Sequence, residues 1–448
     1  MATRTSQFLL VLCFGIASTC FAQAPTWTEK NSPNHPLAGY YSSMVYDSAH
    51  SEIVLFGGTF SDFTPSNETW TWNGSTWTKQ TPANSPPARV GFAMAYDATR
   101  GQVVIFGGVG VRGAPGADAN GFFTDTWVWD GTDWTQKANG PGPLLHVPMV
   151  YDAARQEVVL YGGSVGSPNP LGDTWVWNGT TWTQKFPATS PGPRASHRLA
   201  YDAGRGRVVM FGGSGSGDQP IADTWEWDGT TWTQKFPVTS PSGRNASSLA
   251  YDAGRQRVVL FSGTLGTSIP VDNATWEWDG TNWTPASPAT SPAGRGGSAM
   301  HYDVVRGQVV LFGGVDGALV VVYTDTWVYG APAPTYTTQI APPIDSDGSS
   351  VFSFRRGVIP VKFSLIADGV PTCTLPPATI SLFRTSGASP GFINESDYVS
   401  PADSGSNFRI ADCQFVYNLN AKLLGPGTYR VKININSVEA GSATFGIN

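Results

Sequence analysis

Charged residues are scarce in this chain of 448 residues. Asp, Glu, Lys and Arg together make up 13% of it, against about 25% in an average soluble domain. The formal net charge is −6 at pH 7, and the sequence contains no basic run. A nucleic-acid-binding protein presents a basic patch to the phosphate backbone, so this composition argues against a nucleic-acid partner. Aromatic residues, at 12%, are too frequent for an intrinsically disordered chain.

Long apolar runs are also missing beyond the N-terminus. The apolar stretch Phe8 to Ala17 follows Arg4 and is too short to span a bilayer, which identifies a signal peptide. Cleavage is expected after Ala22, because the alternative site after Ala24 would leave a proline as the first mature residue. We therefore expect residues 1–22 to be a signal peptide. The mature protein is expected to be secreted, cell-surface or periplasmic, without a membrane span.

Cysteine is rare, with four residues in the chain. Cys13 and Cys20 lie in the N-terminal signal segment, so only Cys373 and Cys413 are expected in the mature protein. A cysteine pair in an exported chain indicates one disulfide bond. The alternative is two free buried thiols.

The motifs of several enzyme classes are absent from the sequence. We find no His/Cys cluster with zinc-ligand spacing, no Gly-x-Ser-x-Gly elbow and no P-loop pattern. We therefore expect no metal and no cofactor, we assign no catalytic residue, and we favour a protein that is not an enzyme.

What the sequence does contain is a repeat of about fifty residues. A Tyr-Asp dipeptide marks every copy, with its tyrosine at Tyr46, Tyr96, Tyr151, Tyr201, Tyr251 and Tyr302. An apolar segment ending in an aromatic residue and Gly-Gly or Ser-Gly follows, and then a Trp-x-Trp segment. In five copies Asn-Gly or Asp-Gly comes next, which favours a tight hairpin turn because both positions accept a positive φ. Each copy therefore predicts four short antiparallel strands, A to D.

The ends of the repeat region predict how the repeats assemble. One four-stranded sheet cannot bury both of its faces, so the repeats must stack, and radial stacking gives a β-propeller. The sixth copy ends after Trp327 and lacks strand D, whereas an unassigned strand-like segment occupies residues 26–30. Pairing of that segment with residues 326–329 would complete a sixth blade and cover an exposed sheet edge.

All 17 Trp residues lie between Trp27 and Trp327. They occur at equivalent positions in the repeats, which favours packing between blades. An extended aromatic platform for sugars is the alternative.

The Gly-Gly after an apolar strand and the later Trp resemble kelch repeats, of the galactose oxidase/kelch-like class of propellers. The resemblance covers residues 23–331 and implies an all-β fold, a six-bladed kelch-like β-propeller closed by the N-terminal strand. A copper-radical galactose oxidase would need a propeller cysteine for its Tyr–Cys cross-link, and residues 23–331 contain none. Kelch propellers serve many functions, so the resemblance implies little about activity.

The period ends after Gly330. Residues 332–338 are expected to form a linker, and residues 339–448 contain short strand-like runs separated by turn signals, which predicts an Ig-like β-sandwich. The segment Pro360 to Phe363, together with Cys413 and the end of the chain, resembles bacterial PxKF domains. That resemblance implies no chemistry.

Variation among the repeats indicates where a ligand binds. The B–C link is short in the first repeat and long between Val109 and Thr124, and the D–A links vary as well. Both kinds of link lie at the same ends of their strands, so they share one face of the disc. Because function on repeat scaffolds concentrates where insertions lie, we expect a ligand on this face, at the mouth of the central channel.

Four arginines and two histidines on the D–A links are the candidate ligand-binding residues. They are Arg89, Arg194, Arg244, Arg295, His146 and His197. A guanidinium group fits a carboxylate, so the arginines could bind an acidic glycan. The alternative is that each arginine hydrogen-bonds the backbone of a neighbouring blade and that the histidines are simply exposed.

Together these patterns predict an exported, monomeric kelch-repeat protein. We expect it to bind an extracellular or envelope glycan or protein without catalysis, through the face of the B–C and D–A links. One alternative is a carbohydrate-active enzyme of the sugar epimerase or lyase type, with its site at the channel mouth. A structural surface spacer is the other alternative.

Overall fold

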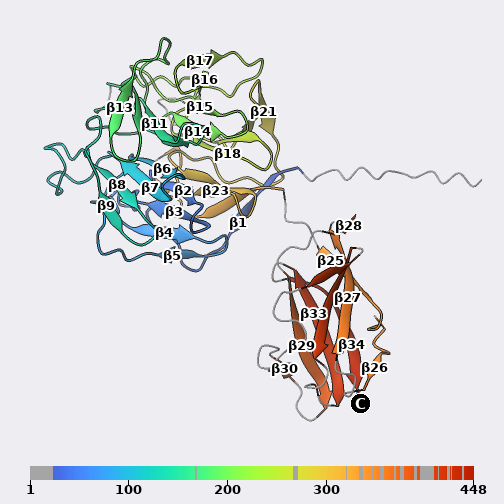
Figure 1. Cartoon of the computed structure of the whole chain (residues 1–448). Coiled ribbons are helices and arrows are strands. Elements are labelled where there is room, and N and C mark those ends of the chain that lie inside the picture. The colour runs from blue at the N-terminus through green and yellow to red at the C-terminus, as the bar shows by residue number, and fades with distance from the viewer. Residues whose placement is uncertain are drawn as a thin grey trace, which may run out of the picture. The chain divides into compact units, whose positions relative to one another are not determined.

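The strands of the computed structural model follow the four segments expected in each repeat (Figure 1). Its contacts divide the chain into a repeat unit, Gln23–Ala331, and a C-terminal unit that includes Pro332–Asn448. The structure describes residues 24–166, 169–265, 271–318, 320–331, 336–345, 347–353, 358–367, 370–373, 378–387, 391–393, 408–411, 413–420, 424, 426–435 and 438–448. The predicted signal peptide, residues 1–22, lies outside these residues.

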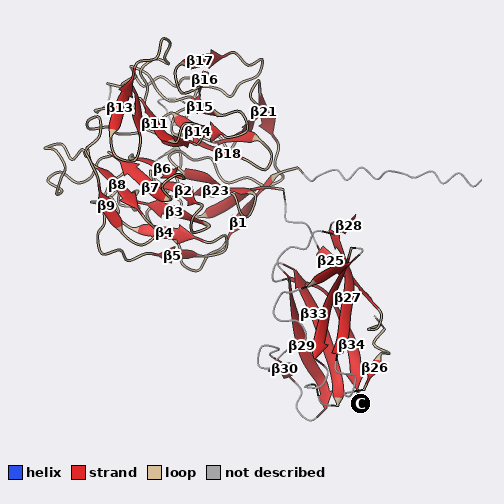
Figure 2. Cartoon of the chain, in the orientation of Figure 1, coloured by secondary structure: helices blue, strands red, loops and turns tan. Residues whose placement is uncertain are grey.

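The described residues of the repeat unit form six four-stranded antiparallel sheets. Five of them each come from one continuous repeat. They are β2 (Ser43–Asp47), β3 (Glu52–Phe56), β4 (Thr69–Trp72) and β5 (Trp77–Lys79); β6 (Ala93–Asp97), β7 (Gln102–Phe106), β8 (Thr126–Trp129) and β9 (Trp134–Gln136); β10 (Met149–Asp152), β11 (Glu157–Tyr161), β12 (Thr174–Trp177) and β13 (Trp182–Lys185); β14 (Arg198–Asp202), β15 (Arg207–Phe211), β16 (Thr224–Trp227) and β17 (Trp232–Lys235); and β18 (Ser248–Asp252), β19 (Arg257–Phe261), β20 (Thr275–Trp278) and β21 (Trp283–Ala286). Figure 2 shows strands and loops, and we find no helix among the described residues, hence none that could span a membrane.

The sixth sheet is assembled from both ends of the repeat unit. Its order is β1 (Thr26–Lys30), β24 (Thr326–Gly330), β23 (Gln308–Phe312) and β22 (Ala299–Asp303). Strand β1 runs antiparallel to β24, with Trp27 opposite Tyr329. The predicted pairing of residues 26–30 with the last strand of the repeats is therefore present, and it gives β24 a hydrogen-bonded neighbour on each side.

The Asx-Gly pairs lie in the predicted turns, but only the glycine of each pair has a positive φ. Each turn holds two further residues, as Ser75 and Thr76 do between Trp72 and Trp77. In the first repeat, the Asn73 carboxamide oxygen accepts hydrogen bonds from the backbone N–H groups of Ser75 and Thr76 at 3.0 and 2.9 Å. Gly74 has φ +95°, a conformation that glycine adopts at low cost. The turn brings Trp77 opposite Trp72 at the start of the hairpin.

The first strands of the six sheets, or inner strands, follow one another in a ring. Each of β2, β6, β10, β14 and β18 contacts the next inner strand, and β22 contacts both β18 and β2. Between adjacent sheets, an indole Nε1 donates to a threonine Oγ1 of the preceding sheet. The six donor–acceptor pairs are Trp77–Thr326, Trp134–Thr69, Trp182–Thr126, Trp232–Thr174, Trp283–Thr224 and Trp27–Thr275, at 2.8–3.0 Å. These tryptophans therefore join neighbouring sheets.

The C-terminal unit contains two five-stranded sheets. One comprises β25 (Tyr336–Ala341), β27 (Val358–Ala367), β28 (Val370–Thr372), β31 (Arg409–Ala411) and β32 (Gln414–Asn420). The other comprises β26 (Val351–Phe352), β29 (Ala378–Gly387), β30 (Gly391–Ile393), β33 (Gly427–Ile435) and β34 (Val438–Ile447). Their alternating apolar residues, such as Phe363 and Val431, share one buried core, as expected when two half-buried sheets pack face to face.

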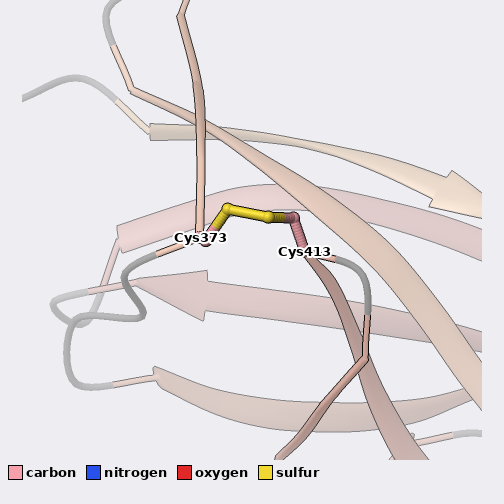
Figure 3. The surroundings of a disulfide bond; sticks show 2 residues. All are labelled: Cys373 and Cys413. Atoms are coloured by element: carbon pink, nitrogen blue, oxygen red, sulfur yellow. A yellow bond between two sulfur atoms is a disulfide. The ribbon is translucent and has the colours of Figure 1, made fainter.

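Two details of the C-terminal unit concern the sequence predictions. Strand β25 begins inside the predicted linker, because Tyr336 already pairs with Ala367 across the sheet. Cys373 and Cys413 form a disulfide bond (Figure 3).

Candidate functional site

The four candidate arginines are buried, and each pairs with an aspartate; Asp125 is buried, and the other three partners are partly exposed. Arg89 is 0% exposed, and its Nη1 and Nη2 donate to the two carboxylate oxygens of Asp125 at 2.6 and 2.9 Å. Nη1 also donates to the Gly107 carbonyl at 3.0 Å, and the guanidinium lies 4.0 Å from the centre of the Phe123 ring. The equivalent two-bond pairs are Arg194–Asp223 and Arg295–Asp325. Arg244 makes a single hydrogen bond to Asp272, and its Nη2 donates to the Ser242 hydroxyl instead.

This pairing gives the four guanidinium groups a role in the scaffold. A buried charge is stable only when a partner compensates it, and here an aspartate at the end of the B–C link does so. The backbone carbonyl that accepts from each arginine belongs to the same repeat, as Gly107 does for Arg89, rather than to a neighbouring one. None of the four arginines lines the central cavity, so the candidate site is built from other residues.

The six inner strands enclose a cavity of about 390 Å³. Every repeat contributes an equivalent segment to its wall, and the segments are Tyr41–Tyr46, Gly91–Tyr96, His146–Tyr151, Arg198–Tyr201, Ser248–Tyr251 and Ser298–Tyr302. The wall extends from Tyr41 and His146, which precede the inner strands, to Ala203 and Val304, which follow them. The cavity is therefore a central channel along the inner strands.

Six residues that each precede an inner strand form what we call the collar, and three of them, Tyr41, Gly91 and His146, line one end of the channel. Its members are Tyr41, Gly91, His146, Ser196, Ala246 and Gly297, and all have φ between +49° and +66°. Five backbone hydrogen bonds of 2.8–3.0 Å link them, with donor and acceptor Tyr41–Gly297, Gly297–Ala246, Ala246–Ser196, Ser196–His146 and His146–Gly91. The positive φ turns each D–A link into its strand and points its N–H along the ring.

The collar lies on the face of the variable links. The residue before each collar residue pairs with the start of the B–C link in the same repeat, as Val90 does with Val109. Val109 in turn pairs with Phe122 at the far side of the long link. The structure thus brings the D–A links, the B–C links and this end of the channel together.

Two aromatic side chains meet at the collar. The rings of Tyr41 and His146 stack with their centroids 4.4 Å apart, although they come from the first and third repeats. The intervening position is Gly91, where a Cβ would lie 2.9 Å from Cδ2 of His146. Glycine therefore allows the stack. Tyr41, which the sequence analysis missed, could have been found as the one tyrosine among the six collar positions.

Arg198 breaks the symmetry of the channel wall. The equivalent positions in the other repeats carry Ser43, Ala93, Pro148, Ser248 and Ala299. The Arg198 Nε donates to the Ser247 carbonyl at 2.6 Å, and Nη1 donates to the His197 carbonyl at 3.5 Å. Within the part of the chain that the structure describes, Arg198 forms no ion pair with a carboxylate. Burial lowers the pKa of its guanidinium.

The histidines of this region have lowered pKa values, which favours their neutral form. Burial, and next the nearby charge of Arg198, lower the pKa of His146 to about 4. Burial also lowers the pKa of His301, which lines the channel, and holds the pKa of His197 well below its ordinary value. His197 does not line the channel: it is buried against Tyr161 with its ring nitrogens unpaired among the described residues. Of the two histidines expected at the site, His146 alone lines the channel.

No metal-binding arrangement accompanies the channel. A search of the described ranges finds no group of three or more His, Cys, Asp and Glu side chains that could hold a metal ion.

Comparisons with known proteins show the fold of the repeat unit. No protein-family model matches the chain, and no curated protein matches its sequence. Solved structures do match, among them one titled "Structure of YjhT", with a TM-score of 0.51, 12% sequence identity, and coverage of 66% of this chain and 96% of that one. At this identity the likeness shows the fold alone. The chain therefore shares an all-β repeat fold of four-stranded antiparallel sheets with a protein of very different sequence.

Proposed function

We propose that the repeat unit is a six-bladed kelch-type propeller and that the C-terminal unit is an Ig-like sandwich of the PxKF type. The ring of inner strands, the pairing of β1 with β24 and the likeness to a solved structure support the first assignment. The shared core of two sheets and the Cys373–Cys413 disulfide support the second. The disulfide also fits a protein exported through an N-terminal signal peptide.

The protein binds a glycan or protein ligand outside the cytoplasm, on the propeller face that carries the B–C and D–A links. One observation carries this proposal: the channel wall departs from its six-fold repetition at and near the collar. Tyr41, His146 and Arg198 project there into positions where most other repeats carry small residues. A concave site with a few placed polar and aromatic groups is the usual form of a ligand site.

The volume of the channel is also suitable for a small ligand. Its volume of about 390 Å³ lies in the range of small-molecule pockets, roughly 300–1,000 Å³. A glycan would insert one terminal residue into the channel while the variable links contact the remainder. A protein ligand would insert a side chain or chain end in the same way.

Binding to a glycan array and to proteins of the cell envelope tests this proposal. We expect a ligand whose affinity falls at least tenfold in Tyr41→Ala, because loss of one buried aromatic contact costs about 1.4 kcal/mol or more. Alanine already occupies the equivalent collar position at Ala246, with φ 49°, so the variant should fold. The control is Phe186→Ala, which removes an aromatic side chain that is 84% exposed after the outer strand β13.

Two results would count against the proposal. A folded protein that captures nothing from either source would overturn it. Equal loss of binding in Phe186→Ala and Tyr41→Ala would place the ligand away from the channel. Turnover of a captured sugar would instead favour the enzyme alternative.

A further inference from the structure

We infer that Arg198 forms a binding site for the carboxylate of a small monoanionic ligand inside the central channel. This inference rests on the proposed binding function and adds the chemical class of the group that enters the channel. It is carried by the placement of one guanidinium group in the channel wall.

Arg198 differs from the other arginines in the interior of the repeat unit. The four that are at most 2% exposed, Arg89, Arg194, Arg244 and Arg295, each have an aspartate partner. Arg198 is surrounded by the inner strands, and over the described residues no carboxylate lies within ion-pair distance of it. Arg198 is partly exposed. An unpaired charge that is largely removed from solvent is costly, and an anion that enters the channel would compensate it.

The guanidinium is held in place and still has donors to offer. Its Nε hydrogen bond to the Ser247 carbonyl, at 2.6 Å, and the weaker bond from Nη1 to the His197 carbonyl, at 3.5 Å, fix the orientation of the plane. In the described structure Nη2 has no hydrogen-bond partner. The fork of Nη1 and Nη2 is therefore available for a carboxylate, whose two oxygens match the spacing of the N–H groups.

The charged residues of the channel wall favour a ligand group that carries one negative charge. Among the described residues that line the cavity, none is Asp, Glu or Lys, and Arg198 is the one arginine. The two lining histidines, His146 and His301, hydrogen-bond or stack as neutral rings. One positive charge balances a carboxylate, whereas it would balance half the charge of a phosphate dianion.

The aromatic pair at the collar supplies the remaining contacts. Tyr41 and His146 lie at the end of the channel, and Arg198 lies at the start of β14, two residues after collar residue Ser196. A ligand whose carboxylate reaches Arg198 would therefore place its ring or chain beside the stacked rings. The site thus favours a small carboxylate with a ring-sized body, such as a uronic acid.

Calorimetric titration with matched probes tests the inference. The probes are D-glucuronate and D-glucose, benzoate and benzyl alcohol, and inorganic phosphate, titrated into the intact protein. Arg198→Ser introduces the residue that the first and fifth repeats carry at this position, Ser43 and Ser248, so the channel wall keeps a side chain that the fold accepts. The control is Arg112→Ser, which removes an exposed arginine from the long B–C link and changes the net charge equally.

We expect each carboxylate to bind about tenfold to a hundredfold more tightly than its neutral partner, because a hydrogen bond to a charged group is stronger than one to a neutral group. The preference should disappear in Arg198→Ser and persist in Arg112→Ser. Unchanged urea midpoints would show that both variants fold.

Other outcomes would overturn the inference. Equal affinities for carboxylate and neutral probes, unaffected by Arg198→Ser, would remove the anion site and leave the proposed binding function standing. Phosphate binding as tight as carboxylate binding would contradict the chemical class. If no carboxylate probe binds while a ligand from the array still loses affinity in Tyr41→Ala, the inference fails alone; if the array and pull-down are also blank, the proposed function fails with it.

Discussion

The indole Nε1 of Trp27 donates a 2.9 Å hydrogen bond to Oγ1 of Thr275. The same bond joins a tryptophan of the fourth strand to the preceding sheet in the five other repeats, for example Trp232 to Thr174 at 3.0 Å. Trp27 is 0% exposed and lies in β1. This strand is at the N-terminal end of the repeat unit's sequence, whereas its sheet partner β24 is at the C-terminal end. Strand β1 is therefore the fourth strand of the last sheet, and it carries the tryptophan that bonds the preceding sheet, as the fourth strand of each other repeat does.

Removal of the Trp27 side chain should destabilise the whole repeat unit. We expect Trp27→Ala to lower the free energy of unfolding by about 3–5 kcal/mol, the usual cost of truncating a buried tryptophan. Glu29→Ala changes an exposed residue of the same strand and should cost less than about 0.5 kcal/mol. Urea unfolding followed by tryptophan fluorescence measures both variants. Equal stabilities of the two would show that β1 does not close the ring.

Two tryptophans of one hairpin should differ in their tolerance of phenylalanine. Trp227 and Trp232 lie opposite each other and are both 0% exposed. The Nε1 of Trp232 donates to Thr174, whereas that of Trp227 finds no partner in the described structure. Trp232→Phe should therefore cost about 1–2 kcal/mol more than Trp227→Phe, because only the former loses a hydrogen bond. Urea midpoints measure the difference, and the reverse order would contradict the inter-sheet role of Trp232.

The ion pairs of the four buried arginines should matter for stability and not for ligand affinity. Arg194→Leu introduces the residue that the third repeat carries at this position, Leu144, and leaves Asp223 without the partner that it contacts at 2.5 Å. We expect a loss of about 3–5 kcal/mol in unfolding free energy, as for other broken buried pairs. Ligand affinity of the folded variant should stay unchanged. A variant of normal stability that no longer binds ligand would show that Arg194 belongs to the site after all.

Acidification should weaken the repeat unit through three histidines, of which His197 is buried and His146 and His301 are partly buried. The pKa of His146 is lowered to about 4, and burial also lowers the pKa values of His197 and His301. Each of these side chains takes up a proton more readily in the unfolded chain, so its contribution to stability is complete above about pH 6.5 and is lost as the pH falls below that value. For His146 the loss extends down to about pH 4. His50 acts in the opposite direction, because its hydrogen bond to Asp47 raises its pKa.

The size of this effect follows from linkage. Each of these three histidines contributes up to about 1.4 kcal/mol per pH unit within its window. Urea midpoints at pH 7, 6 and 5 should therefore fall steadily in the intact protein, and less steeply in His146→Ser with His301→Ala. Those substitutions introduce residues that other repeats carry at equivalent positions, Ser196 and Ala250. A double variant with the same pH slope as the intact protein would contradict the lowered pKa values of both rings.

Much of the scaffold can be predicted from the sequence because its signals are local and recur. A Tyr-Asp dipeptide, an apolar segment and an Asx-Gly turn each define a strand end without reference to distant residues. The pairing of residues 26–30 with the last repeat is also predictable. The sixth repeat lacks its fourth strand, and residues 26–30 form a strand that belongs to no continuous repeat.

The candidate site is harder to predict for a physical reason. Arg89 and Asp125 are 36 residues apart, and nothing in their local sequence shows that the fold joins them, so recurrent arginines looked available for a ligand. Arg198 and Tyr41 were not predicted as site residues because neither belongs to a recurring motif. In a repeat protein the recurring residues maintain the scaffold, and the positions where one repeat departs from the others are the better candidates for function.

The most direct test of carboxylate binding at Arg198 is a crystal structure of the protein soaked with 4-bromobenzoate. Anomalous scattering from bromine locates the probe whatever the natural ligand is. We predict a bromine peak inside the channel, with the carboxylate within hydrogen-bond distance of Nη1 and Nη2 of Arg198, and no such peak in Arg198→Ser. An empty channel, or bromine only on the outer surface of the sheets, would contradict it.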